Sequence, residues 1–299
     1  MWQPEPDWLT VPGGAGPSTV GVWRTARSGR ALVVKRLAPP QAHDVAALSE
    51  PRHFAYWRRA ADVASYGLVE DTPGLIGPRT DVAEDADGIT LTSDWVEDAA
   101  NSGLFIARSL GVFTGADVGH LRWLARGQLR DRISRVAHRG GWPTLARTTA
   151  ADIVDALWQR RNHWLDVSEN LPQVPQHGDP TPANLMGRAD DRVVAVDWGS
   201  LGVGPVGADL GLYLLQAREE FEPLLDSYLL GLPQGRATRE EAAMGARISA
   251  VYTVVTRAEW ALARVAGGEG ALASKFRHPA VAPHLKALQR QAPQIEALL

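Results

Sequence analysis

The sequence predicts an α+β fold of two lobes, a small β-rich amino-terminal lobe and a larger, mainly helical carboxy-terminal lobe. The chain has 299 residues, which exceeds the size of a usual single hydrophobic core. Its first hundred residues read mainly as strands with two-residue alternation, and from about Leu104 the apolar residues recur at helical spacing. We therefore expect lobes at residues 1–98 and 99–299.

The predicted amino-terminal lobe begins with a glycine-rich connector and two strands. Gly13, Gly14 and Gly16 precede an alternating run at 19–26, and a glycine-containing turn leads to a second β-rich run at 31–37. The two runs predict a hairpin. Glycines at this place permit close approach of the backbone to a phosphate, although they do not spell G-x-G-x-x-G.

One helix and one more strand complete the predicted amino-terminal lobe. Residues 51–67 have helical periodicity, with Pro51 able to occupy the first turn and Gly67 to end the helix. Residues 87–98 then return to the composition of a strand.

The carboxy-terminal lobe is predicted to consist of amphipathic helices interrupted by one short hairpin. The predicted helical segments are 103–115, 120–139, 148–167, 208–231, 237–267 and 278–299. The hairpin is predicted from 183–188 and 192–199, with the turn at 189–191.

The composition argues against several classes of protein and site. A net charge of −3 gives no reason to expect a nucleic-acid or membrane-surface partner. The chain has no cysteine, which excludes disulfides, thiolate metal sites and a cysteine nucleophile. No apolar run reaches the length of a transmembrane helix, and the first residues lack the pattern of a signal peptide. We expect a cytoplasmic protein, either a monomer or a homodimer.

The densest group of chemically active residues begins in the stretch QHGDPTPANLM. Four residues separate Asp179 from Asn184, and Asp197 lies thirteen residues beyond Asn184. This is the arrangement of the H-R-D-x-x-x-x-N loop and the D-F-G motif of protein kinases. The corresponding residues here are His177-Gly178-Asp179, Asn184 and Asp197-Trp198-Gly199.

Phosphoryl transfer from ATP explains why these residue types stand at this spacing. A carboxylate such as Asp179 can accept the proton of an attacking hydroxyl. The amide oxygen of Asn184 and the carboxylate of Asp197 are hard donors that suit Mg²⁺. Lys35 lies in the second β-rich run, where a kinase lobe carries the lysine that pairs the nucleotide phosphates. The chain has three lysines and 28 arginines, so a lysine here suggests the need for a compact ammonium.

The region from Gln176 to Gly211 resembles the aminoglycoside phosphotransferase family, which is related to choline and homoserine kinases. Members carry an H-G-D-x-x-x-x-N loop, a hairpin, an I-D-W or similar stretch, and then G-x-x-x-x-D-L-A. The last element here runs from Gly204 to Gly211 and contains Asp209. The resemblance implies a protein-kinase-like bilobal fold. It also implies Mg²⁺-assisted transfer of the γ-phosphate of ATP, with GTP as a possible donor, to a small-molecule hydroxyl. The implied acceptors are an amino sugar, another sugar, an amino alcohol or an antibiotic.

The resemblance also implies a role for each residue of the motif. Asp179 would be the catalytic base, Asn184 and Asp197 the metal ligands, and Asp209 a structural tie between the catalytic loop and a helix. We expect His177 to support the loop and to transfer no proton. The implied nucleotide-binding residues are Gly13, Gly14, Gly16, Lys35 and the hinge residues Asp94, Trp95 and Val96.

One position departs from the family pattern. The first-lobe helix of the family usually carries a glutamate that pairs with the lysine, often as W-R-R-E-A, and this position holds Ala60 here. Glu50 stands near the helix start, and Asp62 lies on a different helix face from Ala60. The partner of Lys35 is therefore open. The alternative function is a nucleotide-binding pseudokinase or regulator, and a metal-dependent hydrolase is a third hypothesis.

Arginines are concentrated in the predicted helix 120–139. Arg122, Arg126 and Arg130 share one face of that helix, with Arg132 and Arg135 nearby. A solvated helix face explains them more simply than an anionic-substrate surface. Their charge is nevertheless the opposite of what a pocket for amine-rich aminoglycosides would need.

Overall fold

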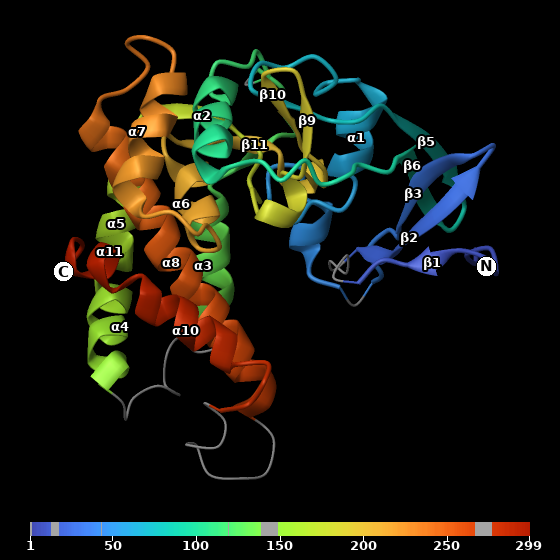
Figure 1. Ribbon diagram of the computed structural model, residues 1–299. Coiled ribbons are helices and arrows are strands. Elements are labelled where there is room, and N and C mark those ends of the chain that lie inside the picture. The colour runs from blue at the N-terminus through green and yellow to red at the C-terminus, as the bar shows by residue number, and fades with distance from the viewer. Residues whose placement is uncertain (1, 13–17, 43, 119, 139–148, 267–276) are drawn as a thin grey trace.

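A computed structural model describes residues 2–12, 18–42, 44–118, 120–138, 149–266 and 277–299 (Figure 1). A β-sheet built from the first hundred residues lies on one side of the molecule, and most of the helices lie on the other (Figure 1). This confirms the predicted α+β fold with a β-rich amino-terminal region and a helical carboxy-terminal part. The exact division at residues 98 and 99 stays a prediction.

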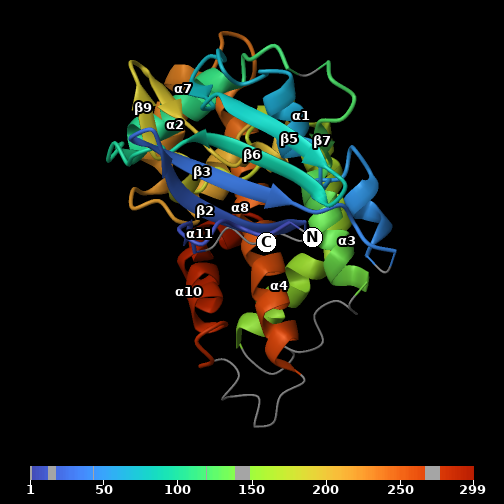
Figure 2. The same ribbon diagram turned by 90° about the vertical axis from the view of Figure 1, so that its right-hand side faces the viewer.

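The amino-terminal sheet has five antiparallel strands in the order β1-β2-β3-β6-β5, and four of them lie side by side in Figure 2. The predicted hairpin is confirmed. Its turn at Ser28 and Gly29 has positive φ at both residues (52° and 78°), as a tight hairpin between right-twisted strands requires. The strands are β1 (Leu9–Thr10), β2 (Thr19–Arg27), β3 (Arg30–Leu37), β5 (Thr80–Asp85) and β6 (Gly88–Asp94).

Three features of this sheet differ from the prediction. The short exposed strand β1 was not predicted. Strand β5 was not predicted either, because it is an edge strand whose residues are mostly exposed and half of them acidic. The predicted strand 87–98 ends early, at Asp94, where the chain leaves the sheet toward the helical part.

Helix α1 (Arg59–Ser65) begins later than the predicted start at Pro51. The guanidinium of Arg59 donates to the backbone oxygens of Pro51, His53 and Phe54 at 2.7, 2.7 and 3.0 Å. These carbonyls would accept helical amide hydrogens if the helix extended that far. The buried arginine therefore stabilises a series of turns where the apolar spacing predicts helix.

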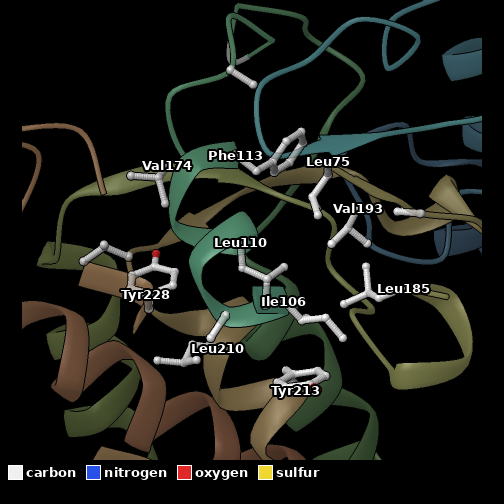
Figure 3. Packing of buried hydrophobic residues seen from close by; sticks show 14 of the residues in the cluster. Leu75, Ile106, Leu110, Phe113, Val174, Leu185, Val193, Leu210, Tyr213 and Tyr228 are labelled. Atoms are coloured by element: carbon white, nitrogen blue, oxygen red, sulfur yellow. The ribbon is translucent and has the colours of Figure 1, made fainter. Parts of the chain in front are cut away.

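Helix α2 (Gly103–Phe113) lies at the centre of the main hydrophobic core. Ser102 caps it by accepting a hydrogen bond from the amide of Phe105 at 3.3 Å. Helices α6 (Ala208–Leu214) and α7 (Phe221–Gly231) pack against it. Figure 3 shows the side chains of α2 between those of the other helices and of the short strands; labelled there are Leu75, Ile106, Leu110, Phe113, Val174, Leu185, Val193, Leu210, Tyr213 and Tyr228.

The remaining helices confirm the helical character of the carboxy-terminal part but are more broken than predicted. Segment 148–167 forms two helices that meet at Arg160, and segment 208–231 likewise divides into α6 and α7. Segment 120–139 becomes helical only after Gly127, because Ala125 and Arg126 form a strand first. The helices are α3 (Gln128–His138), α4 (Thr149–Gln159), α5 (Arg161–Asn170), α8 (Arg239–Ala266), α10 (Ala282–Arg290) and α11 (Ala292–Glu296). None of the helices in the described part of the chain combines the length and apolar character needed to cross a bilayer.

Two small sheets hold the motif region in place. One has the order β7-β11-β8 and delivers the chain at Gln176 to the H-G-D loop. The other has the order β4-β10-β9, and its predicted hairpin turns at Asp190, where φ is +54°. The short strands are β4 (Leu75–Ile76), β7 (Ala125–Arg126), β8 (Gln173–Gln176), β9 (Gly187–Ala189), β10 (Arg192–Val194) and β11 (Gly202–Pro205).

Candidate active site

A cleft of about 600 Å³ opens between the amino-terminal sheet and the motif region. Residues far apart in the sequence, from Val11 to Gln216, line it, so the fold brings the predicted residues into one space. The predicted site residues among its lining are Lys35, Asp94, Trp95, Val96, Asp179, Asn184 and Asp197. Gly13, Gly14 and Gly16 lie outside the described residues.

Asp209, on α6, anchors the loop that carries Asp179. The two carboxylate oxygens of Asp209 accept hydrogen bonds from the amides of His177 and Gly178 at 2.7 and 3.0 Å. Burial raises the pKa of Asp209 to about 7, although the two amide donors act in the opposite direction. Gly178 has φ +83°, and a Cβ there would lie 2.3 Å from the backbone oxygen of Ser200. The loop therefore needs a glycine at 178 and an acceptor of two hydrogen bonds at 209.

His177 is completely buried, and both of its ring nitrogens bond to backbone. Its Nε2 lies 2.9 Å from the backbone oxygen of Val196, and its Nδ1 lies 3.3 Å from the amide of Asp179. Burial lowers the pKa of His177, although Asp179 and Asp197 act to raise it. A neutral ring with its proton on Nε2 satisfies both bonds. This geometry fits a supporting residue.

Asn184 joins Asp179 to the chain that leads to Asp197. The side-chain amide of Asn184 donates to the backbone oxygen of Asp179 at 2.9 Å, and it lies 3.4 Å from the Oδ2 of that residue. The backbone oxygen of Asn184 accepts from the amide of Val196 at 2.8 Å. Because the amide nitrogen of Asn184 is engaged in this way, its Oδ1 remains as a possible cation ligand.

Lys35 and Asp197 form an ion pair across the cleft, with the Nζ of Lys35 2.7 Å from the Oδ1 of Asp197. Partial desolvation of Asp197 in the cleft tends to raise its pKa, but the ammonium of Lys35 outweighs that effect and the pKa is lowered. Asp197 has φ +59°, a conformation that is unusual for a residue other than glycine. Such strain is concentrated at functional sites and persists only where the surroundings hold it.

Ala60 lines the cleft at the position where the family pattern has a glutamate. Neither acid considered from the sequence reaches Lys35. Asp62 pairs with Arg58 at 3.2 Å, and Glu50 is exposed. Among the described residues, the ion-pair partner of Lys35 is Asp197.

Arg59 has a structural role that sequence reasoning missed. Its side chain is 0% exposed, and the donors not used in the 51–54 turns reach the backbone oxygens of Gly199 (3.0 Å) and Trp123 (3.2 Å). Burial lowers its pKa to about 10. Arg59 thus ties α1 to the turn that follows Asp197. No spacing rule marks this residue, because its acceptors are backbone oxygens, and two of them are distant in the sequence.

The hinge side chains are held on the sheet beside the cleft. The carboxylate of Asp94 accepts two hydrogen bonds from Arg30 at 2.8 and 2.6 Å, and the guanidinium of Arg24 lies 4.4 Å above the ring of Trp95. The amide of Trp95 donates to the backbone oxygen of Ala31 at 3.0 Å. These contacts fix the path of the chain at the edge of the cleft.

The hydrolase hypothesis finds no support in this geometry. The part of the chain that the structure describes contains no cluster of three or more histidine or carboxylate residues able to hold a metal ion. His177 would have to be a ligand, but both of its nitrogens are bonded to backbone.

Comparisons with known proteins agree with the fold and the motif. The model of a family described as the phosphotransferase enzyme family matches residues 7–246. Choline kinase LicA from Streptococcus pneumoniae has a similar structure, with a TM-score of 0.59, 11% identity, and coverage of 97% of this chain and 93% of that one. So has the GDP complex of aminoglycoside 2'-phosphotransferase-IIIa, with a TM-score of 0.57, 11% identity, and coverage of 98% and 93%.

A third similar structure is an amicoumacin kinase in complex with AMP-PNP, Ca²⁺ and Ami. Its TM-score is 0.56, its identity is 12%, and coverage is 99% of this chain and 93% of that one. Identities this low establish a shared fold. Among curated proteins, none matches this sequence.

Proposed function

This chain belongs to the phosphotransferase enzyme family, and on that premise we propose that it transfers the γ-phosphate of ATP to a hydroxyl of a small molecule. The observation that carries the proposal is a cleft lined by Asp179, Asn184 and the Lys35–Asp197 ion pair. In the proposed roles, these residues would bring a general base and phosphate-binding groups within reach of one substrate.

The proposed reaction uses Asp179 as the general base. Its carboxylate accepts the proton of the acceptor hydroxyl, the oxygen forms a bond to the γ-phosphorus, and the bond from that phosphorus to the ADP oxygen breaks. The products are a phosphate monoester and ADP. The His177 and Asp209 contacts hold the loop, so that Asp179 is already oriented before substrates bind.

The nucleotide would lie between Lys35 and the hinge residues Asp94 to Val96. Lys35 would neutralise phosphate charge, and the hinge would contact the base. ATP is the proposed donor and GTP is the alternative.

Asn184 and Asp197 fit the ligand preference of Mg²⁺. Each offers an oxygen of the kind that a hard divalent cation prefers, and the amide nitrogen of Asn184 is already engaged elsewhere. A bound Mg²⁺ would neutralise charge on the phosphates. We propose these two residues as its ligands, and we propose a cytoplasmic location because ATP is the donor.

Ala60 favours a second candidate function, a nucleotide-binding pseudokinase. The absence of a glutamate removes the usual orienting partner of Lys35. Two contacts support the enzyme instead, because Asp197 pairs with Lys35 and Arg59 fixes α1 to the turn after Asp197.

A nucleotide-consumption screen separates the two functions. Purified protein with Mg²⁺ and ATP, and in parallel GTP, is incubated with hydroxylated metabolites and antibiotics while ADP or GDP release is measured. The phosphotransferase proposal expects release that depends on an acceptor. A melting temperature raised by Mg-ATP without release for any acceptor would instead support the pseudokinase.

A further inference from the structure

Arginines gather beside Asp179, outside the nucleotide cleft. The Nη2 of Arg257, on α8, lies 3.7 Å from the Oδ1 of Asp179. Arg132, on α3, is close enough to interact electrostatically with both. Asp179 lines the nucleotide cleft, but neither arginine is part of its lining. The two guanidinium groups therefore approach the candidate base from another direction than the nucleotide.

The guanidinium groups of α3 are oriented by an aromatic ring. Those of Arg132 and Arg135 lie 4.8 and 4.6 Å from the centre of the Phe54 ring. A guanidinium held over a ring face, as that of Arg132 is, can still donate its N–H groups to an anion.

Arg132 and Arg257 differ from Arg130 and Arg59 in how their donors are used. Over the described ranges, neither guanidinium makes a hydrogen bond, since 3.7 Å from Arg257 to Asp179 is too long for one. Arg130, two residues from Arg132, donates to both oxygens of Glu169 at 2.6 and 2.8 Å. Arg59 donates to five backbone oxygens. The N–H donors of Arg132 and Arg257 are therefore available to a bound anion.

The charge of this region favours an anion over an amine. Burial and repulsion from Arg257 lower the pKa of Arg132 to about 10, against the attraction of Asp179. Asp131 also attracts Arg132, but its carboxylate accepts from the amide of Phe54 at 3.2 Å and lies 3.8 Å from His53. Guanidinium groups bind carboxylates and phosphates with paired, charge-assisted hydrogen bonds, and a cationic amine would be repelled.

We propose that the acceptor is an anionic alcohol, whose acidic group binds Arg132 and Arg257 while its hydroxyl reaches Asp179. The acidic group is a carboxylate or a phosphate, which share this chemistry. The inference rests on the proposed function, since it names the substrate class of the same site. It also revises the sequence interpretation of these arginines, because Arg130 has the exposed partners expected of a solvated face and Arg132 does not.

The first test compares acceptors that share a carbon chain and differ in charge. One set is glycerol, glycerate, glycerol 3-phosphate and 3-amino-1,2-propanediol, and the other is glucose, glucuronate, glucose 6-phosphate and glucosamine. ADP release with Mg-ATP gives kcat/KM for each compound. We expect an anionic member to exceed its neutral relative by about tenfold or more, and the amine to be the poorest. A comparison of the carboxylate-bearing with the phosphate-bearing acceptors shows which acidic group the site prefers.

The second test uses variants of two arginines with a matched control on the same helix. Arg132→Gln and Arg257→Gln are expected to raise the KM of the anionic acceptor by about tenfold while leaving the KM of ATP unchanged. Arg130→Gln, which loses only the exposed pairs with Glu169 and Asp166, is expected to leave both values unchanged. A rise in the KM of ATP alone would assign the arginines to the nucleotide and overturn the proposal.

Ligand binding is measured separately from turnover, as the shift in melting temperature that each compound causes in wild type and variants. Shifts by anionic compounds that vanish in both arginine variants, without ADP release, would support the anion site and count against the phosphotransferase. Preferred transfer to a neutral or amine-bearing acceptor would overturn the anion site and leave the phosphotransferase standing. The anion site is also overturned if no anionic compound shifts the melting temperature or is phosphorylated.

Discussion

The two sides of the nucleotide cleft are held in place by different physical means. The loop that carries Asp179 is fixed by buried hydrogen bonds from Asp209 and His177 to backbone. Lys35, opposite, is held by an ion pair with Asp197, whose side chain is 44% exposed. Buried bonds to fixed acceptors are costly to break, whereas a partly exposed ion pair contributes little and is screened by salt. The fold therefore holds the loop of the candidate base rigidly, whereas the side chain of Lys35 can change its position.

The largest effect is expected from breaking the rigid side with Asp209→Ala. The amides of His177 and Gly178 would lose their acceptors, and each buried unsatisfied group costs about 1–3 kcal/mol. We expect the free energy of unfolding in urea to fall by about 3 kcal/mol. The control is Asp226→Ala, which removes an exposed partner of Arg239 and should cost less than about 1 kcal/mol. Equal losses in the two variants would contradict the anchoring role.

Arg59→Met is expected to have the next largest effect. Five backbone oxygens would lose a donor, although water can reach some of them after relaxation, so we expect a loss of about 2 kcal/mol. The neighbouring Arg58→Met removes only partly exposed pairs with Glu84 and Asp62 and should cost less than about 1 kcal/mol. Urea unfolding of the two variants measures the difference, and an Arg58 variant less stable than the Arg59 variant would refute it.

Lys35→Met tests the Lys35–Asp197 ion pair through the pH dependence of the free energy of unfolding. The pKa of Asp197 is lowered in the folded protein, so its contribution is present above about pH 4 and is lost as the pH falls further. Removing the ammonium removes the main cause of the lowered pKa. The free energy of unfolding that is lost on acidification should therefore be smaller in the variant, by less than about 1 kcal/mol. Unfolding curves measured on both sides of pH 4 provide the test. An unchanged acid limb in the variant would show that the pair contributes nothing.

The smallest effect is expected from Ala60→Glu, which restores the acid of the family pattern. The new carboxylate would compete with Asp197 for Lys35, in a cleft that has room for it. We expect the free energy of unfolding to change by less than about 1 kcal/mol and the KM of ATP by less than about threefold. Steady-state kinetics with an acceptor from the screen measures the second value. A gain of tenfold or more in kcat would mean that Ala60 limits turnover. The loose hold on Lys35 would then lower the activity of the enzyme.

The sequence predicted the parts of this molecule that depend on short spacing. Asp179, Asn184 and Asp197 fall within twenty residues of one another, joined by a hairpin whose turn residues are recognisable. The sheet hairpin at Ser28 and Gly29 was predicted for the same reason.

The features that the sequence did not predict depend on contacts with backbone atoms, on exposure, and on how distant helices pack. The late start of α1 follows from Arg59 binding backbone oxygens, and strand β5 is too exposed to show an apolar pattern. Arg132 and Arg257 meet beside Asp179 only because α3 and α8 pack together. Helical spacing alone could not distinguish Arg132 from Arg130, since the difference lies in what each guanidinium contacts.

The most direct test of the central claim is acceptor-dependent ADP release by Asp179→Asn. This substitution keeps the shape of the side chain and the backbone oxygen that Asn184 binds, and it removes the proton acceptor. We predict that turnover falls by about 10²-fold or more while Mg-ATP raises the melting temperature as in wild type. Turnover near the wild-type rate, with nucleotide binding intact, would contradict the assignment of Asp179 as the base.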